Sequence, residues 1–214
     1  MEIRERIIET AGGLYEKYGI RSVTMNDIAN ALSISKKTIY QYFKDKDEIV
    51  ATCTSFLLNA REKEIEERLT AEQDAIGRFL IISEHMKRHI RSMNPSLLFD
   101  LERYHPKAWL LYLEHRNTCM LQNLMVTMQA GIDQGVFRQD INVAILAKMR
   151  VEQIQLGFDQ QLFPSKAFDL SEVQIQFFNH FLRGLCTSKG LKQIENHEEN
   201  QQNPIQHEVG KSPQ

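Results

Sequence analysis

Residues 23–44, VTMNDIANALSISKKTIYQYFK, encode two short helices with a tight turn between them, and no other segment constrains the fold as strongly. Thr24 and Asp27 form a capping-box pattern that starts a helix at about residue 25. After the turn, Ser35 is a good N-cap for a second helix over 36–43, because its hydroxyl can accept a hydrogen bond from a free backbone amide. This arrangement predicts a small helical head near the N-terminus.

The rest of the chain is also predicted to be helical, because apolar residues recur at helical spacing and only five prolines and ten glycines occur in 214 residues. The further helices are expected over about 4–18, from 45 into the sixties, 71–92, 106–132, 140–159 and 171–187. Residues 191–214 are polar, so they are predicted to form a disordered tail. The predicted fold class is all-α, with a three-helix head over 1–46 and a helical body over 47–190.

The second short helix has a polar face and an apolar face. The apolar stripe is Ile39, Tyr42 and Phe43, and the polar stripe is Lys36, Lys37, Tyr40, Gln41 and Lys44. A helix of this kind fits the major groove of DNA, where lysine bonds phosphate or guanine and glutamine pairs with adenine. Lysines alone could equally form a solvated helix face. The caps, the turn and the inward apolar set together favour a helix-turn-helix that binds DNA.

The distribution of charge agrees with a local site for a polyanion. Residues 17–46 carry six lysines or arginines and two aspartates, whereas the whole chain has a net charge of −2. A basic patch on an acidic body indicates a polyanion-binding surface confined to the head, and excludes a protein that is basic throughout.

Residues 24–50, TMNDIANALSISKKTIYQYFKDKDEIV, with the preceding IIETAGGLYEKYGIRSV, resemble the tetracycline-repressor (TetR) family of bacterial transcription regulators. The resemblance implies that Thr24 and Lys46 contact phosphates. It also implies that Lys36, Lys37, Thr38, Tyr40 and Gln41 lie at or in the groove. The family usually has glycine where this chain has Ser33. If the backbone there is left-handed, serine costs about 1 kcal/mol.

The same resemblance implies a ligand chamber between the middle helices. Methionines and aromatic residues there suit an apolar effector. The candidate effector-binding residues are Met86, His89, Phe99, Tyr104, Trp109, Leu113, Asn117, Met120 and Leu124. Stripes of this kind also form ordinary core, which is the alternative interpretation. Arg150, Glu152 and Gln153 could bind an effector or simply face water.

The last predicted helix carries two apolar stripes, whereas a helix on the surface of a monomer needs one. The surplus predicts a homodimer interface with the preceding helix, and the TetR resemblance independently implies a homodimer through the last two helices. The predicted interface residues are Ala147, Val151, Ile154, Phe158, Phe177, Phe178, Phe181, Leu182 and Leu185. The alternative is a helix fully buried within one chain.

Other classes of site find little support. Cys53, Cys119 and Cys186 are widely spaced and are interpreted as buried thiols. His85 and His89 lie four residues apart but lack an evident third ligand, so no metal and no cofactor are expected. We find no catalytic motif, so an enzyme is not expected. Without a signal-peptide pattern or an apolar run of about 18 residues, the chain is expected to be cytoplasmic and not in a membrane.

Two hypotheses follow. The leading one is a ligand-responsive transcriptional repressor whose homodimer leaves a palindromic DNA operator when a small, largely apolar effector binds. The alternative is a DNA-bound interaction protein whose helical body docks a partner protein.

Overall fold

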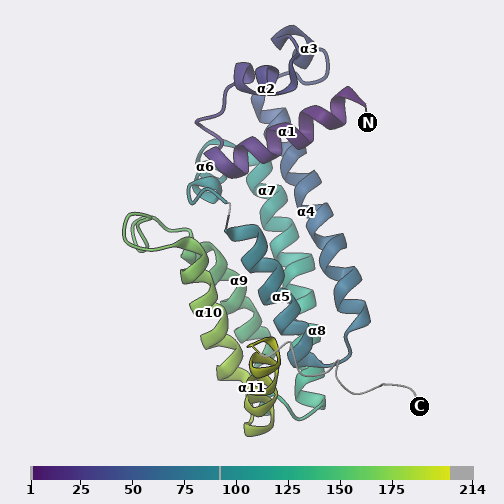
Figure 1. The fold of residues 1–214 in the computed structure, drawn as a ribbon, viewed down its shortest axis with the longest axis vertical. Helices are drawn as coiled ribbons and strands as arrows, with labels where there is room; N and C mark the ends of the chain where they lie inside the picture. The colour runs from purple at the N-terminus through teal and green to yellow at the C-terminus, as the bar shows by residue number, and fades with distance from the viewer. Residues whose placement is uncertain (1, 92, 203–214) are drawn as a thin grey trace, which may run out of the picture.

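Helices make up most of the computed structural model, which describes residues 2–91 and 93–202. They are α1 (Ile3–Tyr18), α2 (Met25–Leu32), α3 (Lys36–Tyr40), α4 (Lys46–Ala71), α5 (Ala75–Ile90), α6 (Leu97–Tyr104), α7 (Pro106–His115), α8 (Leu121–Asp133), α9 (Val143–Gly157), α10 (Leu170–Leu185) and α11 (Ser188–Gln202), with a π-helix, η1 (Arg116–Met120), between α7 and α8. The predicted all-α class is confirmed. Helices α1–α3 form a head at one end, from which α4 runs along the body (Figure 1). No described helix has an apolar stretch long enough to cross a membrane.

The head is built on a buried apolar cluster that includes the start of α4. Its members in this part of the chain are Ile7, Ile8, Ala11, Tyr15, Ile20, Val23, Met25, Ile28, Ala29, Leu32, Ile39, Phe43, Ile49, Val50 and Cys53. Because α4 begins at Lys46 and its first turns pack in this cluster, the predicted boundary at 46/47 falls where α4 enters the head core.

The same apolar cluster continues from the head into the body. Leu98 and Leu101 of α6 belong to it, as do Ala108 and Tyr112 of α7. Beside them, the segment before α6 packs on the end of α1. There the backbone amide of Asn94 donates to the carbonyl of Glu16 over 2.6 Å. The head therefore shares its core with α6 and α7.

A second apolar cluster fills the far part of the body around Phe79 of α5. The ring centroid of Phe79 lies 5.4 Å from that of Phe137, 5.9 Å from Phe178 and 6.3 Å from Phe181. Helices α5, α8, α9 and α10 all contribute to this cluster. It buries the face of α10 that was predicted to contact another copy of the chain.

The predicted dimer interface is therefore corrected. Most of its residues are buried within the single chain, where helices α5 and α8 and neighbouring segments already cover them: Ala147, Val151, Phe158, Phe178, Phe181, Leu182 and Leu185. Ile154 lines an internal cavity, and the ring of Phe177 packs edge-on against Phe163 at 5.5 Å. The alternative interpretation, a helix face buried inside the monomer, describes these residues.

The predicted disordered tail is also corrected over residues 191–202, which belong to α11. Two apolar residues suffice to dock the start of this helix: Ile194 is buried in the second cluster, and Leu191 packs against it. Lys189 Nζ donates to the carbonyl of Gln134 over 2.8 Å, and Arg183 pairs with Glu198 at 2.9 Å. Residues 203–214 lie outside the described residues.

Two helices differ from prediction in ways that shape the body. Helix α4 runs on to Ala71, so α5 begins at Ala75, where the Asp74 carboxylate accepts a hydrogen bond from Gly77 N over 2.9 Å. The helix predicted over 106–132 is interrupted by η1. Helix α7, before η1, contacts α4, whereas α8, after it, contacts α5 and α9. A π-turn holds one residue more than an α-helical turn. The residues of α8 therefore face a different direction from those that continue the stripe of α7.

Candidate DNA-recognition helix and ligand cavity

The two short helices of the head are fixed by local side-chain hydrogen bonds. Thr24 Oγ1 accepts from the amide of Asp27 over 3.2 Å, and the Asp27 carboxylate accepts from the amide of Thr24 over 2.7 Å. These bonds from Thr24 lower the pKa of the Asp27 carboxyl. Ser33 has φ 55° and ψ 41°, so the turn is left-handed, and Ser35 Oγ accepts from Thr38 N over 3.0 Å. The predicted capping box and N-cap are confirmed.

Helix α3 presents a polar face to solvent. Its exposed residues and the residue that follows it are Lys36, Lys37, Tyr40 and Gln41, and Thr38 is half-buried. Ile39 and Phe43 anchor the opposite face in the head core. Tyr42 was predicted to face inward, but it is 40% exposed because α3 ends at Tyr40 and Tyr42 is outside the helical stripe.

Lys46 is placed differently from the other predicted DNA-contact residues. Its Nζ donates to the carbonyls of Ile20 and Val23, over 2.6 Å in each case, and lies 5.9 Å from the centre of the Tyr15 ring. Burial lowers the pKa of this ammonium group. Two of its three donor directions therefore tie α4 to the α1–α2 connection. Its phosphate contact stays a prediction.

Polar contacts join the head to α6, and the sequence patterns did not indicate them. The Arg21 guanidinium lies 4.7 Å from the centre of the Tyr104 ring and donates to the Tyr104 hydroxyl over 3.3 Å. The amide of Arg21 donates to the Asp100 carboxylate over 3.2 Å. On the other side, His105 Nδ1 lies 2.8 Å from the carboxylate of Asp47, next to the start of α4. Such long-range pairs have no local sequence signal.

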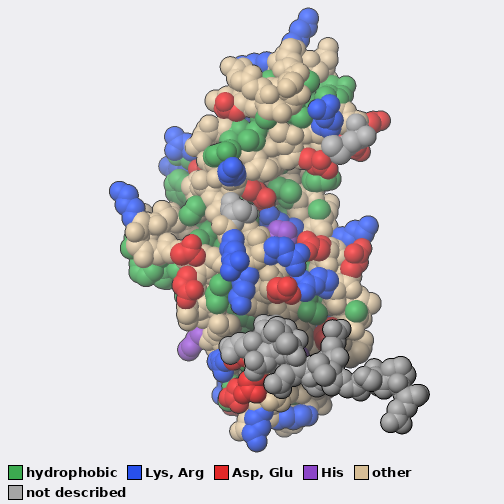
Figure 2. All heavy atoms as spheres, viewed as in Figure 1, with side chains coloured by type: hydrophobic (Ala, Val, Ile, Leu, Met, Phe, Trp, Pro, Cys, Tyr) green, Lys and Arg blue, Asp and Glu red, His purple; other side chains and the backbone are tan. Residues whose placement is uncertain are grey.

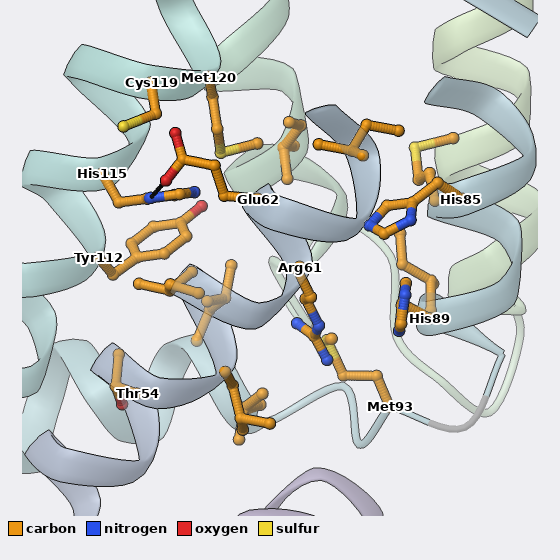
Figure 3. Close-up of a pocket in the computed structure, with 18 of the residues that line it drawn as sticks. Thr54, Arg61, Glu62, His85, His89, Met93, Tyr112, His115, Cys119 and Met120 are labelled. Carbon is orange, nitrogen blue, oxygen red and sulfur yellow. Dashed lines mark ion pairs between the residues drawn. The ribbon is translucent and has the colours of Figure 1, made fainter. Parts of the chain in front are cut away.

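An internal cavity of about 310 Å³ lies between the head and the body. Its wall includes Gly12 and Tyr15 of α1, residues of α4, α5 and α7, and Phe178 of α10. Figure 3 shows Glu62, Tyr112, His115 and Cys119 gathered on one side, with His85 and His89 on the other and Arg61 between them. Most of the lining is apolar, as a small-molecule pocket requires.

The structure brings only part of the predicted effector set to this cavity. Met86, His89, Met120 and Leu124 line it. The others do not, because α6 and α7 turn them elsewhere: Phe99 and Tyr104 are 53% and 42% exposed, Trp109 and Leu113 pack beside the head cluster, and Asn117 is exposed and accepts from Lys148.

Helix α4 supplies a wall of the cavity that sequence reasoning missed. Leu57, Arg61 and Ile65 lie at positions i, i+4 and i+8 and all line the cavity, together with Leu58 and Glu62. That spacing places them on one face of the helix, which is a signal present in the sequence. Charged residues interrupt it, so the face does not stand out as apolar.

The ionisable groups of the cavity are mostly paired or neutral. Arg61 forms an ion pair with Glu16. Burial, and secondarily His89, lower the pKa of His85 to about 4, and burial lowers the pKa of His89 and of His115. These imidazoles are therefore uncharged near pH 7.

Two groups of side chains have the composition of a metal site. They are Glu62 with His115 and Cys119, and Glu64 with His85 and His89, and in each the ligand atoms lie within 4.8 Å of one another. Each offers three of the four ligands that zinc prefers. The Glu64 carboxylate already pairs with Arg88, which competes with a cation.

On the face of the body shown in Figure 2, basic and acidic side chains alternate. Such a mixed surface does not make a continuous footprint for a polyanion. The exposed polar face of α3, in the head, is the surface that was predicted to contact DNA.

Residues 7–53 match the model of a family described as bacterial regulatory proteins, tetR family. The head of this chain therefore matches the TetR family. The matched segment contains the predicted DNA-contact residues of α2, α3 and the start of α4, and none of the predicted effector residues. The match rests on the head and the first turns of α4.

Proteins similar to this chain are transcriptional regulators by name. YvaF of Bacillus subtilis, an uncharacterized regulator, is 33% identical over 113 residues, which cover 50% of this chain and 56% of YvaF. The alignment thus spans little more than half of that relative. The repressor KstR2 of Mycobacterium tuberculosis is 23% identical over 146 residues, covering 67% of this chain and 73% of KstR2.

A solved structure extends the likeness over nearly the whole fold. A transcriptional regulator from Saccharomonospora viridis, described in complex with choline, superposes with a TM-score of 0.72 at 25% identity. The superposition covers 86% of this chain and 97% of the other. The fold of the helical body therefore matches that of a solved structure, beyond the segment that the family model matches.

Proposed function

We propose that this chain is a DNA-binding transcriptional regulator, acting as a repressor that leaves its operator when a small, largely apolar molecule fills the internal cavity. The exposed polar face of α3 would enter the major groove. Lys36 and Lys37 would contact phosphate or guanine, Gln41 would contact adenine, and Thr24, Thr38 and Tyr40 would hold the backbone. The named function of the relatives as regulators, and of KstR2 as a repressor, supports this assignment.

One observation carries the ligand response: head and body share the wall of the cavity. Tyr15, Ile20, Val50 and Cys53 belong to the head core and also line the cavity, opposite Met86 and His89 of α5. A molecule in the cavity would contact both parts at once. Ligand affinity would then differ between two placements of the head, and such a difference is what shifts an equilibrium between states.

The contacts at α6 supply a route by which this change would reach α3. Arg21 and Asp47 of the head hold Asp100, Tyr104 and His105, and Leu98 and Leu101 of the same segment line the cavity. A ligand that displaces α6 would pull on the α1–α2 connection and on the start of α4. Both elements fix the position of the recognition helix.

A homodimer is part of this proposal, on a face other than the predicted one. Ile145, Met149 and Leu156 of α9 are 64%, 42% and 43% exposed and lie at i, i+4 and i+11, which is one helical stripe. An exposed apolar stripe of this kind favours burial against a second copy. The two heads of the dimer would then bind the two halves of a palindromic operator. We place the protein in the cytoplasm, where bacterial DNA lies. No catalytic activity is proposed.

The deciding experiment measures binding of the purified protein to DNA upstream of its own gene by fluorescence anisotropy over a salt series. We expect tight binding that weakens steeply with salt and exceeds binding to a scrambled duplex. Lys37→Ala should weaken operator binding about 10-fold or more and lower the salt dependence. Lys63→Ala, an exposed lysine of α4 in the body, is the matched control and should bind like the parent.

Two results would contradict the proposal. One is equal affinity for operator and scrambled DNA, which would remove sequence recognition. The other is an equal loss for both lysine variants, which would mean that net charge rather than α3 drives binding.

A further inference from the structure

The cavity wall contains a buried arginine with no counter-charge. Arg150 of α9 is only 4% exposed and lines the cavity. Its Nη1 atom has no hydrogen-bond partner among the described residues, and Nη2 lies 3.6 Å from the weak acceptor Sδ of Met86. The guanidinium also lies 5.4 Å from the centre of the Phe178 ring. Sulfur and an aromatic ring are weak partners for a buried charge.

Burial does not remove this charge. It lowers the pKa of Arg150 to about 10, which still leaves the guanidinium protonated near pH 7. Removing a charge from water without a counter-charge is strongly unfavourable, and buried charges in proteins are therefore usually paired. The position of Arg150 calls for a partner that the chain does not supply.

A second buried arginine, Arg116, does have a counter-charge within the chain. Arg116 is 6% exposed, close to Arg150 in burial, but it pairs with Glu152 at 3.0 Å and donates to Gln155 over 2.7 Å. Within the described part of the chain, no carboxylate lies within 4.0 Å of the Arg150 guanidinium. The contrast lies in the partners and not in the depth of burial.

The carboxylates of the cavity wall are engaged elsewhere. Glu16 pairs with Arg61, and the Glu62 carboxylate lies 3.6 Å from His115 Nδ1. The Glu62 side chain is also 22% exposed, so its carboxylate retains contact with solvent. Neither is available to neutralise Arg150 while these contacts persist.

Other polar atoms of the same wall lack partners. The hydroxyls of Tyr15 and Tyr112 and the Nδ1 atom of His85 are buried and form no hydrogen bond with the described residues. They can satisfy a polar group of a bound molecule. Most of the rest of the lining is apolar, and Arg61 is paired with Glu16, so the wall combines a large apolar surface with one positive charge that has no counter-charge.

We propose that the cavity binds a small molecule with an apolar body and a carboxylate, and that this carboxylate pairs with the guanidinium of Arg150. The planar guanidinium matches a carboxylate with two parallel hydrogen bonds, which a neutral or cationic group cannot form. This inference rests on the proposed function and names the chemical class of the effector. It predicts an anionic ligand, whereas choline, named in the Saccharomonospora viridis complex, is a cation.

The test uses three probes that each carry an unbranched ten-carbon chain and differ in head group: decanoate, decanol and decyltrimethylammonium. Their affinities are measured by isothermal titration calorimetry on the DNA-free protein at pH 7.5, below the concentrations at which the probes form micelles. We expect decanoate to bind at least about tenfold more tightly than decanol, because a charge-assisted pair forms out of water. Decyltrimethylammonium should bind more weakly than either.

Two substitutions assign the effect to Arg150. Arg150→Met keeps a long apolar side chain, and we expect it to abolish the preference for decanoate over decanol. It should also raise the melting temperature of the ligand-free protein, because an unpaired buried charge is removed. Arg116→Met, the matched control, should keep the preference and lower the melting temperature, because it breaks a pair.

Several outcomes would overturn the proposal: equal binding of decanoate and decanol, tighter binding of the cation, no binding of any probe, or a decanoate preference that survives in Arg150→Met. A lower melting temperature of Arg150→Met would assign the arginine a structural role instead.

Operator release is measured separately by anisotropy, so the two proposals fail in different ways. Tight decanoate binding through Arg150 without release supports the ligand site and contradicts the regulatory response. Release by decanol together with weak decanoate binding contradicts the Arg150 site and leaves the regulatory response standing.

Discussion

The head and the cavity place charged groups in opposite surroundings. On α3, Lys36 and Lys37 project into water, where a lone charge costs little and is free to attract a phosphate. In the cavity, Arg61 is paired, the histidines are held neutral by burial, and Arg150 is buried without a counter-charge. Exposed groups can be changed with little effect on stability, whereas buried ones affect folding first. The two regions thus predict two kinds of mutant behaviour.

The largest expected effect comes from an exposed residue outside both regions. Ile145→Glu places a charge on the apolar stripe of α9, and we expect it to convert a dimer to a monomer. Operator affinity should then fall by about 100-fold, because the second head is no longer tethered. Light scattering after size-exclusion chromatography measures the mass, and circular dichroism checks that the helices remain.

Leu110→Glu on α7 is the matched control, because Leu110 and Ile145 are both 64% exposed. It should leave mass and operator affinity unchanged. A dimer that persists in Ile145→Glu would place the interface on another face.

A large effect is also expected from Lys46, the half-buried lysine at the start of α4. Lys46→Met leaves the carbonyls of Ile20 and Val23 without their donor, so we expect a loss of roughly 1–3 kcal/mol in unfolding free energy. Urea unfolding followed by circular dichroism measures it. Lys37→Ala, exposed on α3, should unfold like the parent. If Lys46→Met instead kept full stability and lost operator binding, its implied phosphate contact would be its main role.

The cavity histidines predict how stability depends on pH. The pKa of His85 is about 4 in the folded protein, below the ordinary value of 6.5, so the unfolded chain binds the proton more readily. This histidine's contribution is complete above pH 6.5 and is lost as the pH falls toward 4. The melting temperature should drop by a few degrees over this window.

Other groups titrate in the same window, so the effect of His85 is isolated by comparison. His85→Gln should show a smaller drop in melting temperature than the parent between pH 6.5 and 4. An equal drop in both proteins would assign the pH dependence to other groups.

The smallest expected effect is at Ser33. Its φ of 55° is strained for a residue with a side chain, so Ser33→Gly should raise the unfolding free energy by about 1 kcal/mol or less, after the entropy cost of glycine. Differential scanning calorimetry measures the shift, and operator affinity should stay the same. Ser96→Gly, outside the turn, is the control and should give no gain.

The head could be predicted from sequence because its determinants are local. Thr24 and Asp27, or Ser35 and Thr38, are three residues apart, and each pair forms the expected hydrogen bonds. The prediction that Tyr42 faces inward was wrong because α3 stops at Tyr40, three residues before the predicted end at residue 43. Local patterns fix where a helix starts more firmly than where it ends.

The body was harder to predict because apolar spacing does not say which surface covers a stripe. Phe178 and Phe181 were predicted to contact a second copy of the chain, but Phe79 of the same chain packs against them. Helix α11 was missed because few apolar residues dock it, Ile194 among them. The burial of Arg150 could not be foreseen either, since a missing partner is a property of the folded surroundings alone.

The shared core between head and body bears on how such a protein can be recombined. Leu98, Leu101, Ala108 and Tyr112 complete the apolar cluster of the head. A chimera joined at residue 46 would therefore transfer the head without the α6 and α7 residues that complete its apolar core. To carry the specificity of this head to another regulator, α6 and α7 must be transferred with it, because both supply residues to its core. The unit that can be exchanged between regulators therefore consists of two separate segments of the chain, one holding the head and the start of α4 and the other holding α6 and α7.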